Sequence, residues 1–320
     1  MNENIIKTIC SEMNRYLNNY QMSKLNEALY KRLDSNDNEI SNDEYLEKFI
    51  SSKKLEGCSD LTIRNYNIHI IKLFEYLNKD IRTVDTEDLR GYLSYYQGIN
   101  NCNSTTIDGV RRSLSSFFTF LEEEDYIIKS PTRRIHKIKT EKLVKETYSD
   151  EALERLRNKC DDIRNLAIID LLSSSGIRIG ELVNLNVEDI NFENKSCIVF
   201  GKGKKMREVY FDGKTKVNLQ EYLSRRNDDN KALIVSRYKP YKRISYRGIE
   251  AMLKRLGKEI GIYKVHPHKF RRTLATRVID KGMPIEQVQH LLGHTKIDTT
   301  LHYAMVNQNN VKISHRKFIC

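Results

Sequence analysis

The stretch TTIDGVRRSLSSFFTFLEEE, residues 105–124, decides how the first half of the chain folds. Its apolar residues recur every three or four positions, as they do on the buried side of an amphipathic helix. Arg111 and Arg112 fall off this apolar stripe, so we expect both to face solvent or a partner. The stretch therefore predicts a long helix with one side in a core. The residues of the stripe are Ile107, Val110, Leu114, Phe117, Phe118 and Leu121.

The segments before this helix have the same helical character. Residues 62–79 repeat the spacing, and residues 84–96 begin with Asp85 or Thr86 as an N-cap followed by acidic residues. Residues 41–130 are therefore predicted to form a small all-helical domain of four or five helices. The four-residue spacing over residues 5–31 predicts one further helix in an N-terminal extension, residues 1–40, that could be an accessory helix or a partner-docking arm.

A basic stretch, KSPTRRIHKIKTEKLVK, follows at residues 129–145. Like charges repel one another and keep a chain extended, so residues 131–146 are predicted to be a linker. Such a linker could lie along a phosphate backbone, or it could simply be solvated. Its candidate DNA-binding residues are Arg133, Arg134, Lys137 and Lys139.

The pattern from residue 147 to residue 320 predicts a second domain. Residues 149–159 begin a helix capped by Ser149 or Asp150, and residues 163–176 form a strongly apolar helix that ends near Gly176. Residues 195–211 are predicted to be a β-hairpin around a glycine-lysine turn, and helices return from about Ser245. The fold class is therefore mainly α with one small antiparallel β-sheet.

Composition limits the possible partners and the compartment. A formal net charge of +12 attracts polyanions, so nucleic acid is the first candidate partner, ahead of an anionic membrane. A basic but otherwise ordinary enzyme would show the same charge. The chain has no apolar run near the roughly 18 residues of a membrane span, and its start does not resemble a signal peptide. Its 6 cysteines include no C-x-x-C pair, which favours reduced thiols in a cytoplasmic protein.

Four short stretches carry residues that could do chemistry, and each also has an ordinary explanation. In SSSGIRIGELVNLNVEDI, residues 173–190, Arg178 and Glu181 could be a surface ion pair. The lysine of GKGKK could sit on a solvated hairpin tip. VHPHKFRRTLATRVI, residues 265–279, places His268 and Arg271 on one helix side. In LLGHTKIDTTLHYAMV, residues 291–306, Tyr303 could be a packing residue.

The sequence also argues against two other kinds of site, a nucleotide-hydrolysing P-loop and a metal site. The GKT at residues 213–215 lacks the leading glycine of a P-loop, because Glu208 stands there. His266, His268, His290 and His294 could imitate a metal site, but the chain has no H-E-x-x-H motif, and the neighbouring arginines would repel a cation. We therefore expect neither nucleotide hydrolysis nor a metal, and no cofactor.

Together the four stretches describe a metal-free site for a phosphodiester. Two arginines can grip the phosphate oxygens and follow the charge that grows on them in the transition state. A lysine on a hairpin can protonate the leaving oxygen, and histidines can share protons. A tyrosine becomes a useful nucleophile only where nearby cations favour its phenolate.

In order and spacing these stretches resemble the tyrosine recombinase (phage integrase) family, close to its Xer-like and integrase branches. SGIRIGEL resembles the family's first arginine motif, which would make Arg178 catalytic and Glu181 supporting. The hairpin lysine matches Lys202, and H-x-x-R matches His268 to Arg271. L-L-G-H places a further active-site histidine at His294, and the nucleophile falls on Tyr303. Arg272 departs from the pattern, since many relatives carry a second histidine there.

The resemblance covers about residues 41–310 and implies a fold and a reaction. The fold would be a helical core-binding (SAM-like) domain over residues 41–130 and a catalytic domain of the DNA breaking-rejoining enzyme fold over residues 147–320. The reaction would cut and rejoin duplex DNA through a 3′-phosphotyrosyl link, with strand exchange through a Holliday junction. The implied assembly is a homotetramer or heterotetramer on two recombination sites, in the cytoplasm and associated with the nucleoid. Further candidate DNA contacts are Arg111, Arg112, Lys204, Lys205 and Arg272.

Two other functions remain open from the sequence. A non-catalytic DNA-binding regulator on the same fold would need the same basic charge, but it would not need every chemical position to be filled. A topoisomerase of the same chemistry would relax supercoils as a monomer, without strand exchange. Neither the target DNA sequence nor the biological role, whether chromosome-dimer resolution or integration of a mobile element, can be deduced from these residues.

Overall fold

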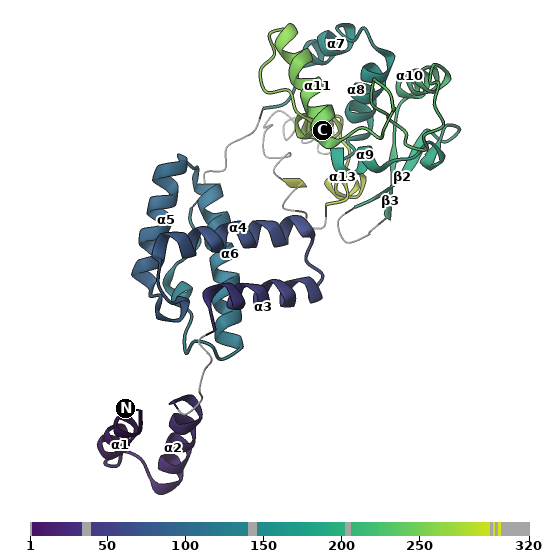
Figure 1. The fold of residues 1–320 in the computed structure, drawn as a ribbon. Helices are drawn as coiled ribbons and strands as arrows, with labels where there is room; N and C mark the ends of the chain where they lie inside the picture. The colour runs from purple at the N-terminus through teal and green to yellow at the C-terminus, as the bar shows by residue number, and fades with distance from the viewer. Residues whose placement is uncertain are drawn as a thin grey trace, which may run out of the picture. The chain divides into compact units, whose positions relative to one another are not determined.

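The computed structural model describes residues 2–33, 40–139, 146–201, 206–294, 297, 300 and 301. The chain divides into two compact units, Met1–Lys142 and Leu143–Cys320. The first is helical, and the second combines helices with a three-stranded antiparallel sheet (Figure 1). The predicted fold class, mainly α with a small antiparallel sheet, is confirmed.

The leading segment forms two helices, so the prediction of a single helix over residues 5–31 is wrong. They are α1, Asn2–Met13, and α2, Asn19–Leu33, and they pack against each other. The break comes at Asn18, whose side chain accepts from the Gln21 backbone N–H at 2.9 Å while its own N–H donates to the Gln21 side chain at 3.1 Å. This reciprocal cap starts a new helix, which the apolar spacing alone does not reveal.

Four helices build the rest of the first unit around one core. They are α3 (Asn42–Leu55), α4 (Asp60–Leu77), α5 (Thr86–Asn100) and α6 (Ser104–Glu123). Each begins at a side chain that accepts from the first turn, and for α5 this residue is Asp85. All six residues of the predicted stripe on α6 are buried, and Phe117 and Phe118 are each 0% exposed.

The start of the predicted linker is packed against this unit. Residues 131–134 form a short 3₁₀ helix capped by Ser130, and Thr86 Oγ1 donates to the Pro131 carbonyl at 2.9 Å. Ile135 and Ile138 contact the helical core. These two isoleucines, three positions apart, oppose the extension that the surrounding charges favour, and so residues 131–138 are not an extended linker. Residues 140–145 lie outside the described part of the chain.

The second unit is built around α8, Ile163–Ser175, which is buried along most of its length. It packs against α10 (Gly213–Ser224), α12 (Pro267–Asp280) and α7 (Asp150–Asn158), the last of which is capped by Ser149. The other α-helices among the described residues of this unit are α9 (Ile179–Asn184), α11 (Tyr246–Glu259) and α13 (Ile285–Leu292). Burial of α8 fixes the position of Gly176, the residue at which this helix ends.

The predicted hairpin is present, with a third short strand beside it. The sheet order is β1 (Ile190–Asn191), β2 (Ser196–Phe200) and β3 (Met206–Tyr210), all antiparallel. Val199 pairs with Arg207, and Phe200 pairs with Met206. The tip of the hairpin, residues 202–205, lies outside the described residues.

Candidate active site

Arg178 and Glu181 stand where the chain leaves the buried helix α8. Gly176 ends that helix in the left-handed region, with φ +60°, and Arg178 is the N-cap of α9. The Arg178 side chain donates to Glu181 Oε1 at 2.8 Å, and its backbone N–H donates to Oε2 at 2.9 Å. The Glu181 side chain is only 5% exposed and that of Arg178 is 33% exposed, so the carboxylate of this pair is buried and the pair is not the surface pair that the spacing also allowed.

Arg271 connects this segment to a distant one. It lies on α12, which begins at Pro267 directly after the cap position, and it is 4% exposed. Its Nη1 donates to the carbonyl of Gly176 at 2.6 Å, and its Nη2 donates to the carbonyl of Leu292. The second arginine motif therefore holds together the residues that precede Arg178 and the residues that precede His294.

The turn after α13 completes the cluster. Gly293 ends that helix with φ +61°, and its carbonyl accepts from Arg178 Nη2 at 2.8 Å, across 115 positions of sequence. His294 follows, with Nδ1 2.9 Å from Thr300 Oγ1. Three of the four predicted stretches are thus brought to one place by hydrogen bonds to the backbone.

A further arginine, which the sequence reasoning missed, shares the carboxylate of Glu181. Arg207 on β3 donates from Nη1 to Oε1 at 2.5 Å and from Nη2 to Oε2 at 2.7 Å. Alternation along β3 places Arg207 on the same side as the buried Val209. A charged residue at an inward position of a short strand needs a partner, and this was the signal in the sequence.

Charge and burial set the protonation of the cluster. Burial lowers the pKa of His294 to about 4, helped by Arg271, Arg178 and Arg207. Burial and then Arg271 and Arg178 also lower the pKa of His268. Burial acts to raise the pKa of Glu181, but hydrogen bonds from Arg207 and Arg178 outweigh it and lower the pKa overall. At neutral pH the site therefore has three guanidinium groups, one carboxylate and two uncharged imidazoles.

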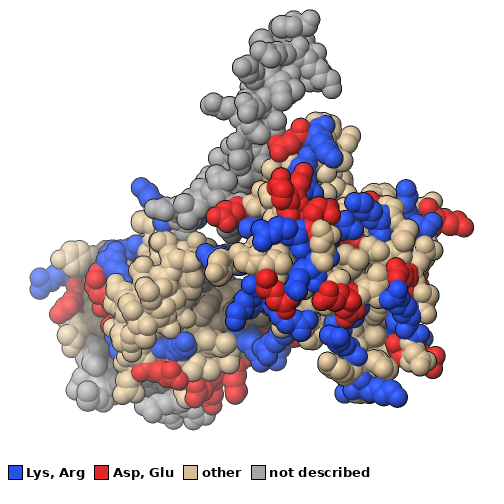
Figure 2. All heavy atoms as spheres, turned by 90° about the horizontal axis from the view of Figure 1, so that it is seen from above, with Lys and Arg blue, Asp and Glu red and all other residues tan. Residues whose placement is uncertain are grey.

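Lys202, Lys204, Lys205 and Tyr303 lie outside the described residues. Of the other candidate DNA contacts, Arg112, Arg134, Lys137 and Lys139 are exposed, and Arg272 is partly buried. Arg133 is exposed and pairs with Glu122 at 2.6 Å. Figure 2 shows Lys and Arg side chains interspersed with Asp and Glu over the visible face. The positive charge is thus spread over the surface in that view.

Arg111 does not face solvent, contrary to expectation. Its side chain is 14% exposed and donates to Asp108 at 2.8 Å, whereas that of Arg112 is 66% exposed. Asp108 also accepts from the Ile138 N–H at 3.2 Å. Arg111 therefore helps to hold residues 131–138 on α6.

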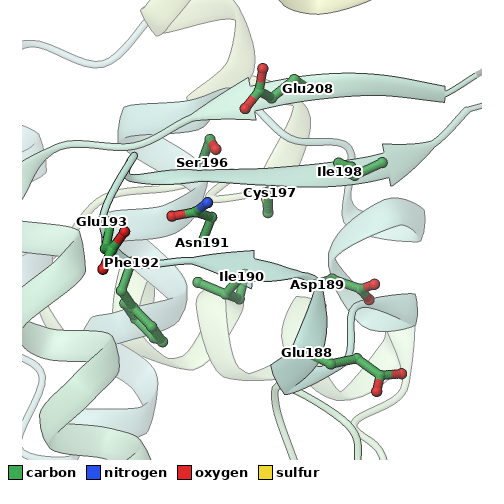
Figure 3. A pocket seen from close by; sticks show the side chains of 10 residues that line it. All are labelled: Glu188, Asp189, Ile190, Asn191, Phe192, Glu193, Ser196, Cys197, Ile198 and Glu208. Atoms are coloured by element: carbon green, nitrogen blue, oxygen red, sulfur yellow. The ribbon is translucent and has the colours of Figure 1, made fainter.

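A hollow of about 540 Å³ beside the sheet is a different feature (Figure 3). It is lined by residues of the three strands, of the segment before β1 and of the turn between β1 and β2, including Glu188, Asp189, Glu193 and Glu208. Four carboxylates would repel a phosphate, so this hollow is not the phosphate site.

Among the described residues, no group of three or more His, Cys, Asp and Glu side chains is arranged to hold a metal ion. No helix within the described ranges is both long enough and apolar enough to cross a bilayer.

Comparison with known proteins identifies the family. The sequence profile of the phage integrase family matches residues 137–310, and that of the phage integrase N-terminal SAM-like domain matches residues 45–128. The chain belongs to the phage integrase family. As a member of it, the chain is a tyrosine recombinase, an enzyme of site-specific DNA recombination.

Individual relatives are similar in sequence to this chain over most of its length. Tyrosine recombinase XerC of Leptospira interrogans is 32% identical over 290 residues, covering 86% of this chain and 92% of that protein. Tyrosine recombinase XerA of Pyrococcus horikoshii is 30% identical over 278 residues, covering 86% and 93%. The structure of XerH site-specific recombinase bound to a palindromic difH substrate has the same fold, with a TM-score of 0.69 at 21% identity over 97% of this chain and 93% of that one.

Proposed function

We propose that this tyrosine recombinase cuts and rejoins duplex DNA with Tyr303 as nucleophile. The observation that carries the proposal is the arginine cluster. Arg178 and Arg271 come from separate elements and are held together through the carbonyls of Gly176, Leu292 and Gly293. The chain then reaches Tyr303 nine positions after His294, which lies in the same cluster. Arginines so placed would clamp a scissile phosphate and stabilise the charge of its transition state.

The reaction then proceeds in two exchanges. The Tyr303 oxygen attacks phosphorus as its phenolic proton passes to the uncharged His268 or His294, the bond from phosphorus to the 5′ oxygen breaks, and Lys202 supplies the proton that this oxygen takes up. His268 and His294, both uncharged in the free protein, assist by hydrogen bonding or proton sharing. The 5′-hydroxyl of a partner strand next attacks the 3′-phosphotyrosyl link and releases Tyr303. Each step replaces one phosphoester by another, so ATP is not required.

The two units have different roles in the proposed reaction. Residues 41–130 act as the core-binding domain and residues 147–320 as the catalytic domain, with residues 131–146 between them. The exposed Arg112, Arg133, Arg134, Lys137 and Lys139 contact the phosphate backbone, together with Lys204, Lys205 and Arg272. Four protomers on two sites exchange strands through a Holliday junction. Because these contacts release counterions, affinity should fall with added salt.

The experiment begins by finding a site that the protein binds. The Tyr303→Phe variant is incubated with genomic fragments, and the bound DNA is recovered and sequenced. Nicked suicide duplexes of the recovered site are then mixed with the wild-type protein, and covalent adducts are resolved on denaturing gels. Wild type should form an adduct through a 3′ phosphate, and Tyr303→Phe should form none.

A matched control separates the nucleophile from tyrosines in general. Tyr263 is 84% exposed, so Tyr263→Phe should form the adduct at the wild-type rate. An adduct that persists in Tyr303→Phe, or no adduct from wild type on the recovered site, would contradict the proposal.

A further inference from the structure

Arg207 holds the active-site carboxylate more completely than Arg178 does. Its two terminal nitrogens bind both oxygens of Glu181, at 2.5 and 2.7 Å, while the Arg178 guanidinium makes one such bond, at 2.8 Å. A paired fork of this kind fixes the direction of the carboxylate as well as its distance. The side chain of Arg207 is only 12% exposed, so its guanidinium contacts Glu181 and is largely shielded from solvent.

Sharing one carboxylate between two arginines has an electrostatic consequence. If Glu181 paired with Arg178 alone, the carboxylate would cancel the charge that the phosphate needs. With Arg207 present, two positive charges face one negative charge, and the group keeps a net positive charge. Arg178 can then be oriented by Glu181 without being neutralised by it.

The stem of Arg207 also fits under the turn that carries His294. A Cβ added at Gly293 would lie 2.6 Å from Arg207 Cδ and 3.0 Å from Nε, so Arg207 fills the space that a side chain would occupy there. The carbonyl of the same glycine accepts from Arg178. Arg207, Glu181, Arg178 and Gly293 thus form a closed ring of contacts that joins β3, α9 and the turn after α13.

The orientation of Arg207 has a cost in hydrogen bonding. Within the described part of the chain, Nε of Arg207 is a buried side-chain donor without a partner. Buried donors are seldom left unpaired. The orientation in which the two terminal nitrogens of Arg207 bind Glu181 is therefore kept although it leaves Nε without a hydrogen-bond acceptor. This arrangement favours a role that depends on the direction of the fork.

We propose that Arg207 is a positioning residue of the proposed active site, which acts through Glu181 to orient Arg178. The role rests on the proposed function. Arg207 is the second residue of β3, and its two bonds to Glu181 tie this strand to the first turn of α9.

The test compares cleavage and DNA binding in the same variants. Arg207→Met should lower the single-turnover rate of adduct formation on the suicide duplex roughly 100-fold, the loss that misplacement of reacting groups by about 1 Å can cause. The Kd for the uncleaved duplex should stay at the wild-type value. Arg207→Lys keeps the charge but cannot bind both oxygens in a planar fork, and it should give an intermediate rate. Arg225→Met, which breaks an exposed pair with Glu221, is the matched control and should cleave normally.

A double-mutant cycle shows whether Arg207 acts through Glu181. If it does, Arg207→Met combined with Glu181→Gln should lose much less than the product of the two single losses. Losses that multiply, or normal cleavage by both Arg207 variants while wild type forms the adduct, would overturn the positioning role and leave the proposed function intact. If Arg207→Met does not fold, Arg207→Lys and the control decide the result. Absence of an adduct in wild type would overturn the proposed function, and this role with it.

Discussion

Arg271 donates from Nη1 to the carbonyl oxygen of Gly176 at 2.6 Å, although the two residues are 95 positions apart. Its Nη2 reaches the carbonyl of Leu292. Carbonyl oxygens hold a guanidinium in place without cancelling its charge, whereas Arg178 and Arg207 share the carboxylate of Glu181. The site therefore combines two ways of fixing an arginine, and both leave positive charge for a phosphate.

Gly176 should not tolerate a side chain. Its φ is +60°, and a Cβ would lie 2.8 Å from Leu274 Cδ2 and 3.2 Å from Leu292 Cδ2. We expect Gly176→Ala to lower the free energy of unfolding of this unit by about 2–4 kcal/mol, from left-handed strain and overpacking together. Hydrogen exchange in urea, read on peptides from residues 146–294, reports this unit separately from the other.

Gly180 provides the control for that substitution. It lies in α9, and a Cβ there would meet nothing within 4 Å. Gly180→Ala should therefore leave the unfolding free energy unchanged or raise it by up to about 1 kcal/mol. Equal losses in the two variants would show that the close packing around Gly176 is not the cause.

Glu181→Gln should make the second unit less stable in a pH-dependent way. Removing the charge leaves the largely buried guanidinium of Arg207 and the partly exposed one of Arg178 without their carboxylate, at a cost of about 3 kcal/mol at neutral pH. The folded pKa of Glu181 is lowered, so the unfolded chain takes up a proton first as the pH falls below about 4.3. The stability that Glu181 contributes is therefore complete above this value and is lost as the pH falls through the folded pKa.

Urea unfolding of wild type and Glu181→Gln at several pH values between 7 and 3 checks this expectation. The difference between the two proteins should shrink toward the acid end. A difference that stays constant over the whole range would mean that Glu181 is not held ionised by Arg178 and Arg207.

The sequence predicted the parts of this site that depend on local pattern. Gly176 was recognised as the end of a buried helix, and the spacing of His268 and Arg271 placed them on one side of a helix. It did not predict that the side chains of Arg207 and Arg111 would be largely buried. Tertiary packing determines that Glu181 and Asp108 are their partners. In Arg111 the partner is only three positions away, yet the same spacing is usually a surface pair. Burial decides between the two, and burial is a property of the whole unit.

His294 should remain uncharged well below neutral pH in the free protein. Burial is the main cause, with Arg271, Arg178 and Arg207 adding to it, and the pKa is about 4. The unfolded chain binds a proton near pH 6.5, so His294 should make folding less favourable as the pH falls from about 6.5 toward 4. Titration of isotope-labelled histidine by NMR, with His294→Gln to assign the signal, measures the pKa directly.

The same titration in Arg207→Met tests the contribution of one neighbour. Loss of a nearby positive charge should raise the pKa of His294 above its wild-type value. A wild-type midpoint near 6.5 would show that neither burial nor the arginines act on this imidazole as the structure implies.

Arg111 and Arg112 are adjacent in sequence and should respond to substitution in opposite ways. Arg111→Ala removes a covered partner of Asp108, whose side chain is 9% exposed and also holds the Ile138 N–H. We expect it to lower the unfolding free energy of the first unit by about 1.5–3 kcal/mol, the range for hydrogen bonds to charged groups. Arg112→Ala removes a side chain that is 66% exposed and lies 3.4 Å from Asp108, so its effect on stability should be within about 0.5 kcal/mol.

If Arg112 contacts a phosphate, the slope of log K against log salt for duplex DNA should become less steep by about 0.9 in Arg112→Ala. Fluorescence anisotropy of a labelled duplex at several salt concentrations measures this slope. A change of slope in Arg111→Ala with no loss of stability would reverse the two assignments.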